Sequence, residues 1–225
     1  MSCYRLSKVT IGSGVTSIGF QAFDYCYQLM EICNASSCKN LNSGTNSTPA
    51  YNHYDPNEGN TKIKVIDDFM FYVDDNVCHL FAYVGSNKNI TLPQNCDGRE
   101  YTFTFAFYGD SVIESVTIPE TIYSIPSNAF NMCTNLKSVT LPNSITSIGG
   151  YAFADCASLE EITLPQGITN LKSTVFYCTP IREIVFLGTS QQWSESNNAS
   201  SFQKYGVTAY AQTVNIKCSD GYIEH

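Results

Sequence analysis

The sequence predicts an α+β repeat solenoid: a right-handed coil of short parallel strands with short helical returns, interrupted by a β-hairpin insert. The first observation behind this prediction is an Ala-Phe dipeptide that recurs with a period of 23 residues. The second is a strand-like triplet in the same frame of each repeat. Such regular spacing is the signature of a repeat architecture. The dipeptides are Ala22-Phe23, Ala106-Phe107, Ala129-Phe130 and Ala152-Phe153, and Val175-Phe176 follows at the same interval.

Each triplet predicts one short strand. In Val116-Thr117-Ile118, alternation sends the two aliphatic side chains to one face and the threonine to the other. Pro119 then ends the strand, because proline donates no ladder hydrogen bond. One coil cannot bury its own apolar side, but stacked coils can, with strands about 4.8 Å apart. The equivalent strand ends are Gly12, Pro142 and Pro165.

The segment Ala-Phe-x-x-Cys-x-x-Leu has apolar residues at about helical spacing, which predicts a short helix or 3₁₀ turn as the return of each coil. Cys26, Cys133 and Cys156 lie three residues after the repeat phenylalanine, and Cys3 falls in the same column. Small, semi-apolar thiols suit such an interior column. The disulfide state of the other cysteines stays open: Cys33, Cys38, Cys78, Cys96, Cys178 and Cys218.

Composition excludes several function classes. The 225-residue chain has a formal net charge of −8, with 12 basic and 20 acidic residues. Nucleic acid is therefore an unexpected partner, because phosphate backbones are bound by clustered Lys and Arg. No apolar run is long enough for a transmembrane helix. Charged residues make up 14% of the chain, against about 25% in a typical soluble protein, which favours a polar, uncharged binding surface.

The repeat resembles the BspA-type leucine-rich repeats, a class with 23-residue repeats. The residues that carry the resemblance include LKSVTLPNSITSIGGYAFADCASLEEITLP at 136–165, and it covers about residues 3–32 and 100–187. The resemblance implies a leucine-rich-repeat-like coil, a cell-surface or extracellular location, and adhesion or partner binding without catalysis. We expect a monomer that binds an unidentified protein or glycan ligand.

The predicted organisation has four parts. Residues 1–32 hold N-terminal repeats with a truncated start, and no signal peptide is present, so the location is inferred from the resemblance alone. Residues 33–99 form an inserted loop and a hairpin over 69–85, and residues 100–187 hold the main repeats. Residues 188–225 form a capping segment, which a solenoid end requires. Its candidates are Trp193, Phe202, Tyr205 and the strand around Val214-Asn215-Ile216.

The search for chemistry finds no catalytic, cofactor-binding or metal-binding motif. Cys78 and His79 could suggest a nucleophile and base, but neighbours on a strand point to opposite faces. Asp220 lies in a Ser-Asp-Gly sequence that predicts a turn rather than a metal site. We therefore expect no enzyme, no cofactor and no metal.

Two surfaces are candidate binding sites. The first is a polar strand face, although threonine also simply suits exposed strand positions. It comprises Thr10, Thr117, Thr140, Thr163, Ser115, Ser138 and Glu161. The second is a set of insert aromatics that could stack on sugars: Tyr51, Tyr54, Tyr72 and Tyr83. They correspond to two hypotheses, an interaction module or adhesin, and a glycan-binding accessory module of a surface polysaccharide system.

Overall fold

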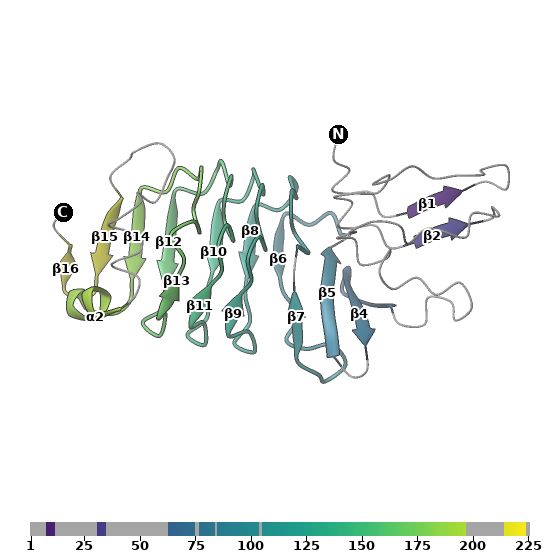
Figure 1. The fold of residues 1–225 in the computed structure, drawn as a ribbon, viewed down its shortest axis with the longest axis horizontal. Coiled ribbons are helices and arrows are strands. Elements are labelled where there is room, and N and C mark those ends of the chain that lie inside the picture. Colours follow the sequence, from purple (N-terminus) through teal and green to yellow (C-terminus); the bar gives the residue numbers. More distant parts are fainter. Residues whose placement is uncertain are drawn as a thin grey trace.

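The structure is a computed structural model of the chain, and it describes residues 8–11, 31–34, 63–74, 77–83, 85–103, 105–196 and 214–223. The chain forms a β-solenoid of about five turns with parallel strands (Figure 1). Successive coils stack along the long axis of the molecule, and the C-terminus lies at one end of the stack. The predicted coil of short parallel strands is thus confirmed.

One ladder consists of the strands that begin each coil. Residues 23 or 26 positions apart pair in register, so Val116 lies between Ile90 and Val139. Each of these three aliphatic side chains is buried, as the alternation predicts. The strands are β6 (Asn89–Thr91), β8 (Ser115–Thr117) and β10 (Ser138–Thr140) in one sheet, and β12 (Glu161–Leu164), β14 (Glu183–Phe186), β15 (Asn215–Cys218) and the antiparallel β16 (Gly221–Tyr222) in the next.

A second, shorter ladder follows the turn in each coil. Its strands have two residues each, with one side chain buried and one facing outward. Ile125, Ile148 and Leu171 supply the buried side chains. The strands are β9 (Ser124–Ile125), β11 (Ser147–Ile148) and β13 (Asn170–Leu171). The same period also aligns β1 (Lys8–Ile11) with β2 (Glu31–Asn34), which pair in parallel.

The returns are not helical, which corrects the sequence prediction. The amides of Phe130 and Met132 donate to the carbonyls of Ala152 and Ala154 in the next coil, at 2.8 and 2.9 Å. An α-helix would instead direct each amide to the carbonyl four residues earlier. Met132 is also left-handed, with φ of 63°, which interrupts a right-handed helix. The equivalent residues Gly109, Asp155 and Cys178 share this conformation, with φ of 69°, 55° and 55°.

The repeat phenylalanines stack along the centre of the solenoid. Phe107, Phe130, Phe153 and Phe176 are fully buried, with ring centroids 5.0, 5.4 and 6.0 Å apart along the column. Adjacent rings are within 15° of parallel. The separation is close to the spacing of paired strands, so the rings stack because the backbone ladders set their distance.

A polar column runs beside the phenylalanines. Cys133 and Cys156 are buried, and their thiols donate to the carbonyls of Phe107 and Phe130 at 2.9 and 3.1 Å. Burial raises the pKa of both thiols, that of Cys156 to about 12. The predicted interior role is confirmed for these two; Cys3 and Cys26 lie outside the described residues. Thr179 continues the column, since its hydroxyl donates to the Phe153 carbonyl.

The described cysteines are free thiols. They are Cys78, Cys96, Cys133, Cys156, Cys178 and Cys218. Cys38 and the side chain of Cys33 lie outside what the structure describes, so a bond between them is untested.

The insert forms a four-stranded sheet. The predicted hairpin is confirmed, since Phe69–Asp74 (β4) pairs antiparallel with Val77–Tyr83 (β5). Two further strands were not predicted: β3 (Ile63–Ile66), which pairs with β4, and β7 (Tyr101–Phe103), which pairs in parallel with β5. The turn between β3 and β4 uses Asp67 and Asp68 with positive φ, a less familiar hairpin signal than Asn-Gly or Asp-Gly.

The C-terminal segment covers the apolar end of the stack. Within the described ranges, Ser190–Glu195 (α2) is the only helix. Thr189 caps it through a reciprocal pair of hydrogen bonds with Gln192, and this capping box stabilises the helix start. Trp193 is buried against Phe186, with ring centroids 5.2 Å apart. Trp193 and the strand around Ile216 thus lie where the cap was predicted, while Phe202 and Tyr205 fall outside the described residues.

We expect Phe130→Ala to lower the free energy of unfolding by about 3–5 kcal/mol, because it leaves a cavity between two stacked rings. Chemical denaturation followed by far-UV circular dichroism measures this loss. The control is Thr140→Ala on an exposed strand position, which should cost at most about 1 kcal/mol. An equal effect of the two substitutions would contradict a load carried by the ring column.

Candidate binding face of the solenoid

The outward side chains of the first ladder form one continuous polar surface. Thr91, Thr117 and Thr140 are aligned in register, and all three are exposed. We call this surface the ladder face, and define it as Asn89, Thr91, Ser115, Thr117, Ser138, Thr140, Glu161 and Thr163. The structure therefore brings together six of the seven residues predicted for a strand face.

The seventh predicted residue, Thr10, lies on β1, where it pairs with Cys33. Its side chain is outside what the structure describes. Thr91 and Asn89 were missed among the candidates, although the NITLP sequence at 89–93 carries the repeat frame and could have identified them. The threonine row ends at Thr163, because Val185 and Lys217 occupy the next two positions.

The ladder face carries little charge and is internally hydrogen-bonded. The Ser115 hydroxyl donates to the Asn89 amide oxygen at 2.7 Å. Only Glu161 among its eight residues is ionisable with charge at neutral pH. Small hydroxyl and amide groups can exchange water for partner hydrogen bonds without the large cost of burying a charge. The surface is thus suited to a partner with repeated polar groups.

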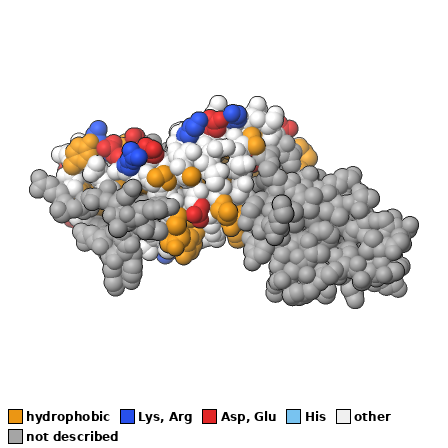
Figure 2. All heavy atoms as spheres, turned by 90° about the horizontal axis from the view of Figure 1, so that it is seen from above, with side chains coloured by type: hydrophobic (Ala, Val, Ile, Leu, Met, Phe, Trp, Pro, Cys, Tyr) orange, Lys and Arg blue, Asp and Glu red, His pale blue; other side chains and the backbone are white. Residues whose placement is uncertain are grey.

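A row of alternating charges borders the ladder face, one residue before each strand. Glu114 lies between Lys88 and Lys137, and each ammonium is 2.7 Å from one of its carboxylate oxygens. Arg182 pairs with Glu160 at 3.8 Å in later coils. We call Lys88, Glu114, Lys137, Glu160 and Arg182 the charge ladder. Figure 2 shows basic and acidic side chains lying next to one another along an edge of the solenoid.

The charge ladder lowers the pKa of Glu114 to about 2, from an ordinary 4.5, first through the hydrogen bond with Lys137 and then through that with Lys88. Lys88 in turn has a raised pKa because of Glu114. These groups neutralise each other, so the border adds little net field to the ladder face. The sequence reasoning missed them, because the signal is the alternation of Lys, Glu, Lys, Glu and Arg at one repeat position.

The insert aromatics do not form the predicted platform. Tyr83 is only 2% exposed, and its ring packs on Phe69 with centroids 5.0 Å apart. Its hydroxyl accepts a hydrogen bond from the Asn87 amide at 3.1 Å. Tyr83 is therefore a core residue and offers no ring face to a sugar. Tyr51, Tyr54 and the side chain of Tyr72 lie outside the described residues.

The groups considered for chemistry have structural surroundings. Cys78 is buried, while the His79 ring is hydrogen-bonded to the Thr102 hydroxyl at 2.9 Å. Asp220 lies in a turn, and its carboxylate accepts from the Ser190 amide and hydroxyl at 2.8 and 2.9 Å. In the part of the chain that the structure describes, no cluster of three His, Cys, Asp or Glu residues could hold a metal ion. The described helix is also too short to cross a membrane.

Comparison with known proteins identifies the repeat. The family model described as BspA type leucine rich repeat region matches residues 1–103 and 100–217, in six copies. The chain is similar to the crystal structure of a leucine rich cell surface protein from Faecalibacterium prausnitzii A2-165. The two are 23% identical with a TM-score of 0.52, over 86% of this chain and 51% of that one.

A second solved structure, the pneumococcal vaccine antigen PcpA, is 20% identical with a TM-score of 0.54, over 82% of this chain and 51% of that one. The chain therefore spans about half the length of these two structures. At this level of identity, both show that the fold is shared. No curated protein matches the chain.

The charge ladder predicts a pH-dependent effect of Glu114→Gln. Because folding lowers the pKa of Glu114, its contribution to stability is complete above about pH 4.5 and is lost as the pH falls toward about 2. We expect the variant to melt below the native protein at pH 7, and the two to converge near pH 2. Thermal melts across this range measure the difference.

The matched control for this experiment is Glu120→Gln, which removes an exposed carboxylate outside the charge ladder. High salt should also reduce the Glu114 effect, since exposed ion pairs are screened. A melting difference that stayed constant from pH 7 to pH 2 would show that the two lysines do not act on Glu114.

Proposed function

The chain belongs to the BspA-type leucine-rich repeat family, and on this premise we propose that it is a non-enzymatic interaction module that binds a partner through its ladder face. The proposed location is extracellular or at a cell surface, and the proposed role is adhesion or partner binding. The observation that carries the proposal is the exposed, in-register row of hydroxyl groups on β6, β8 and β10.

The geometry of this row supports binding of an extended partner. Thr91, Thr117 and Thr140 repeat at the strand spacing of about 4.8 Å, so a partner with regularly placed polar groups can meet several of them at once. Extended repeat surfaces are used for binding in many solenoid proteins. The flanking charge ladder is internally neutralised, which leaves hydrogen bonding and shape as the source of affinity.

The location is supported by resemblance. One similar structure is described as a leucine rich cell surface protein. The other is described as a vaccine antigen. A repeat module of this kind is suited to a surface, because its polar ladder can be displayed along the length of the stack.

The glycan-binding alternative has less support. Of its four aromatic residues, Tyr83 is buried, and the other side chains lie outside the described residues. The ladder face can bind hydroxyl-rich polymers as well as proteins, so the partner screen includes both classes.

We expect Thr140→Trp to weaken partner binding at least about tenfold, because it places a large ring at the centre of the ladder face. Binding of the native chain to extracellular-matrix proteins, immobilised glycans and intact cells first identifies a partner, and surface plasmon resonance then compares the variants. Ser124→Trp, on an exposed position of the other ladder, is the matched control and should keep native affinity.

Two results would contradict the proposal. One is the absence of any partner bound more strongly by the native chain than by Thr140→Trp. The other is equal loss of binding in both tryptophan variants, which would indicate a general surface effect. Far-UV circular dichroism establishes that each variant keeps the native fold.

A further inference from the structure

The strands β7 and β9 occupy equivalent repeat positions but do not pair. Tyr101 and Ser124 lie 23 residues apart, the spacing that places β9 beside β11 and β11 beside β13. Yet β7 is the edge strand of the insert sheet, and β9 is the edge strand of the second ladder. Two strand edges that the repeat would bring together therefore belong to different sheets.

Three extra residues account for this separation. Twelve residues separate the starts of β6 and β7, whereas nine separate the starts of β8 and β9. The additional length forms a tight turn in which Cys96 and Arg99 exchange backbone hydrogen bonds of 2.9 and 3.1 Å. Gly98 has φ of 77°, a conformation that glycine adopts without strain. After this turn, β7 pairs with β5 instead of β9.

The separation leaves backbone groups of β9 without their repeat partners. In later coils, the Thr146 amide donates to the Tyr123 carbonyl at 2.9 Å, and the Thr169 amide donates to the Thr146 carbonyl at 3.0 Å. No corresponding bond joins the described residues Tyr123 and Glu100. Pro126 stands at the position of Gly149, whose amide donates to Ile125, and proline has no amide hydrogen to donate.

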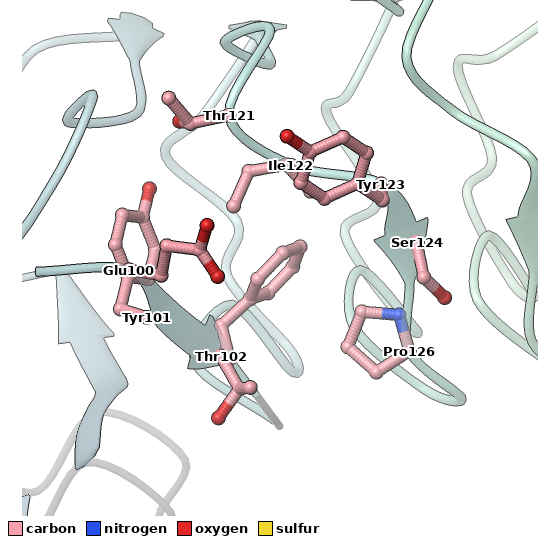
Figure 3. Close-up of a pocket in the computed structure, with 9 residues that line it drawn as sticks. Glu100, Tyr101, Thr102, Thr121, Ile122, Tyr123, Ser124 and Pro126 are labelled. Carbon is pink, nitrogen blue, oxygen red and sulfur yellow. The ribbon is translucent and has the colours of Figure 1, made fainter.

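A cleft of about 290 Å³ fills the space between the two edges. Figure 3 shows Glu100 on the β7 side and Tyr123 on the β9 side, with Ile122 between them. Phe103 and Ile122 are buried and make the base apolar. Tyr123 is 58% exposed, and Glu100 is also exposed. The remaining lining residues are Tyr101, Thr102, Thr121, Ser124 and Pro126.

We propose that this cleft binds an extended peptide segment of a partner protein, which adds as a strand at the β7 and β9 edges. Edge strands are templates for an added strand, because they present backbone donors and acceptors. The apolar base accepts an aliphatic or aromatic side chain, and the Glu100 carboxylate selects a neighbouring Lys or Arg. The net charge of −8 favours such a basic segment.

Other occupants fit the cleft less well. A helix with its side chains is about 10–12 Å across, which is too wide for a cleft of this volume. A sugar could stack on Tyr123, but it would leave the strand edges without backbone partners. The proposed site is separate from the ladder face, and it does not depend on the function proposed for that face.

The test uses the full chain and a displayed library of random 12-residue peptides. We expect enriched peptides to contain Lys or Arg next to a β-branched or aromatic residue. Calorimetry on synthetic copies should show binding that Ser124→Trp weakens at least about tenfold and that Thr140→Trp leaves unchanged. This pair of variants reverses the result expected for the ladder face, so failure of one proposal is distinguishable from failure of the other.

Backbone methylation tests strand addition directly. Methylating the amide nitrogens of alternate peptide residues should abolish binding in one set and preserve it in the other, since alternate amides of a strand point to opposite sides. Glu100→Gln should weaken the basic peptide but not its norleucine analogue. No enriched peptide, equal binding by Ser124→Trp, equal tolerance of both methylation sets, or a glycan signal abolished by Ser124→Trp would overturn the proposal.

Discussion

Register between successive coils is the constraint on which the rest of the structure depends. A period of 23 residues places equivalent backbone groups at hydrogen-bonding distance, and the side chains follow from that placement. The stack of Phe107, Phe130 and Phe153 is one consequence, with centroid distances of 5.0 and 5.4 Å. The row of exposed threonines is another, since the same register that buries valine in the middle of each strand exposes its neighbour. The interior and the candidate binding surface therefore have one cause.

A change of three residues in that period is enough to alter which strands pair. The ladder of first strands tolerates it, because β6 still aligns with β8. The second ladder does not, and β7 joins the insert sheet. The difference arises because the extra turn at Cys96–Arg99 lies after β6 and before β7. The insert thus shares a strand with the coil that follows it, rather than being attached by a loop alone.

Much of the solenoid could be predicted from the sequence, because burial and strand ends depend on local residue types. Val116, Ile118 and Pro119 report a strand and its end without any knowledge of their neighbours. The returns could not be predicted in the same way. Their apolar spacing resembles that of a helix, but the amides of Phe130 and Met132 bond to the next coil, and this depends on stacking.

The candidate site divides along the same line. Thr117 and Thr140 could be placed on a common face from alternation and period alone. Tyr83 could not be assigned to the core from its own segment, because its burial depends on Phe69 across the hairpin and on the turn that holds Asn87. The cleft between β7 and β9 also escaped prediction, since it results from a strand that changes its pairing partner.

The charge ladder has a consequence for how such a chain can change its length. Lys88, Glu114, Lys137, Glu160 and Arg182 alternate in sign from coil to coil. Loss of a single coil by recombination would leave two like charges adjacent, and gain of a single coil would do the same. Loss or gain of two coils would restore the alternation. Charge parity therefore favours variation of the repeat number in pairs, although the apolar core would accept a coil of either kind.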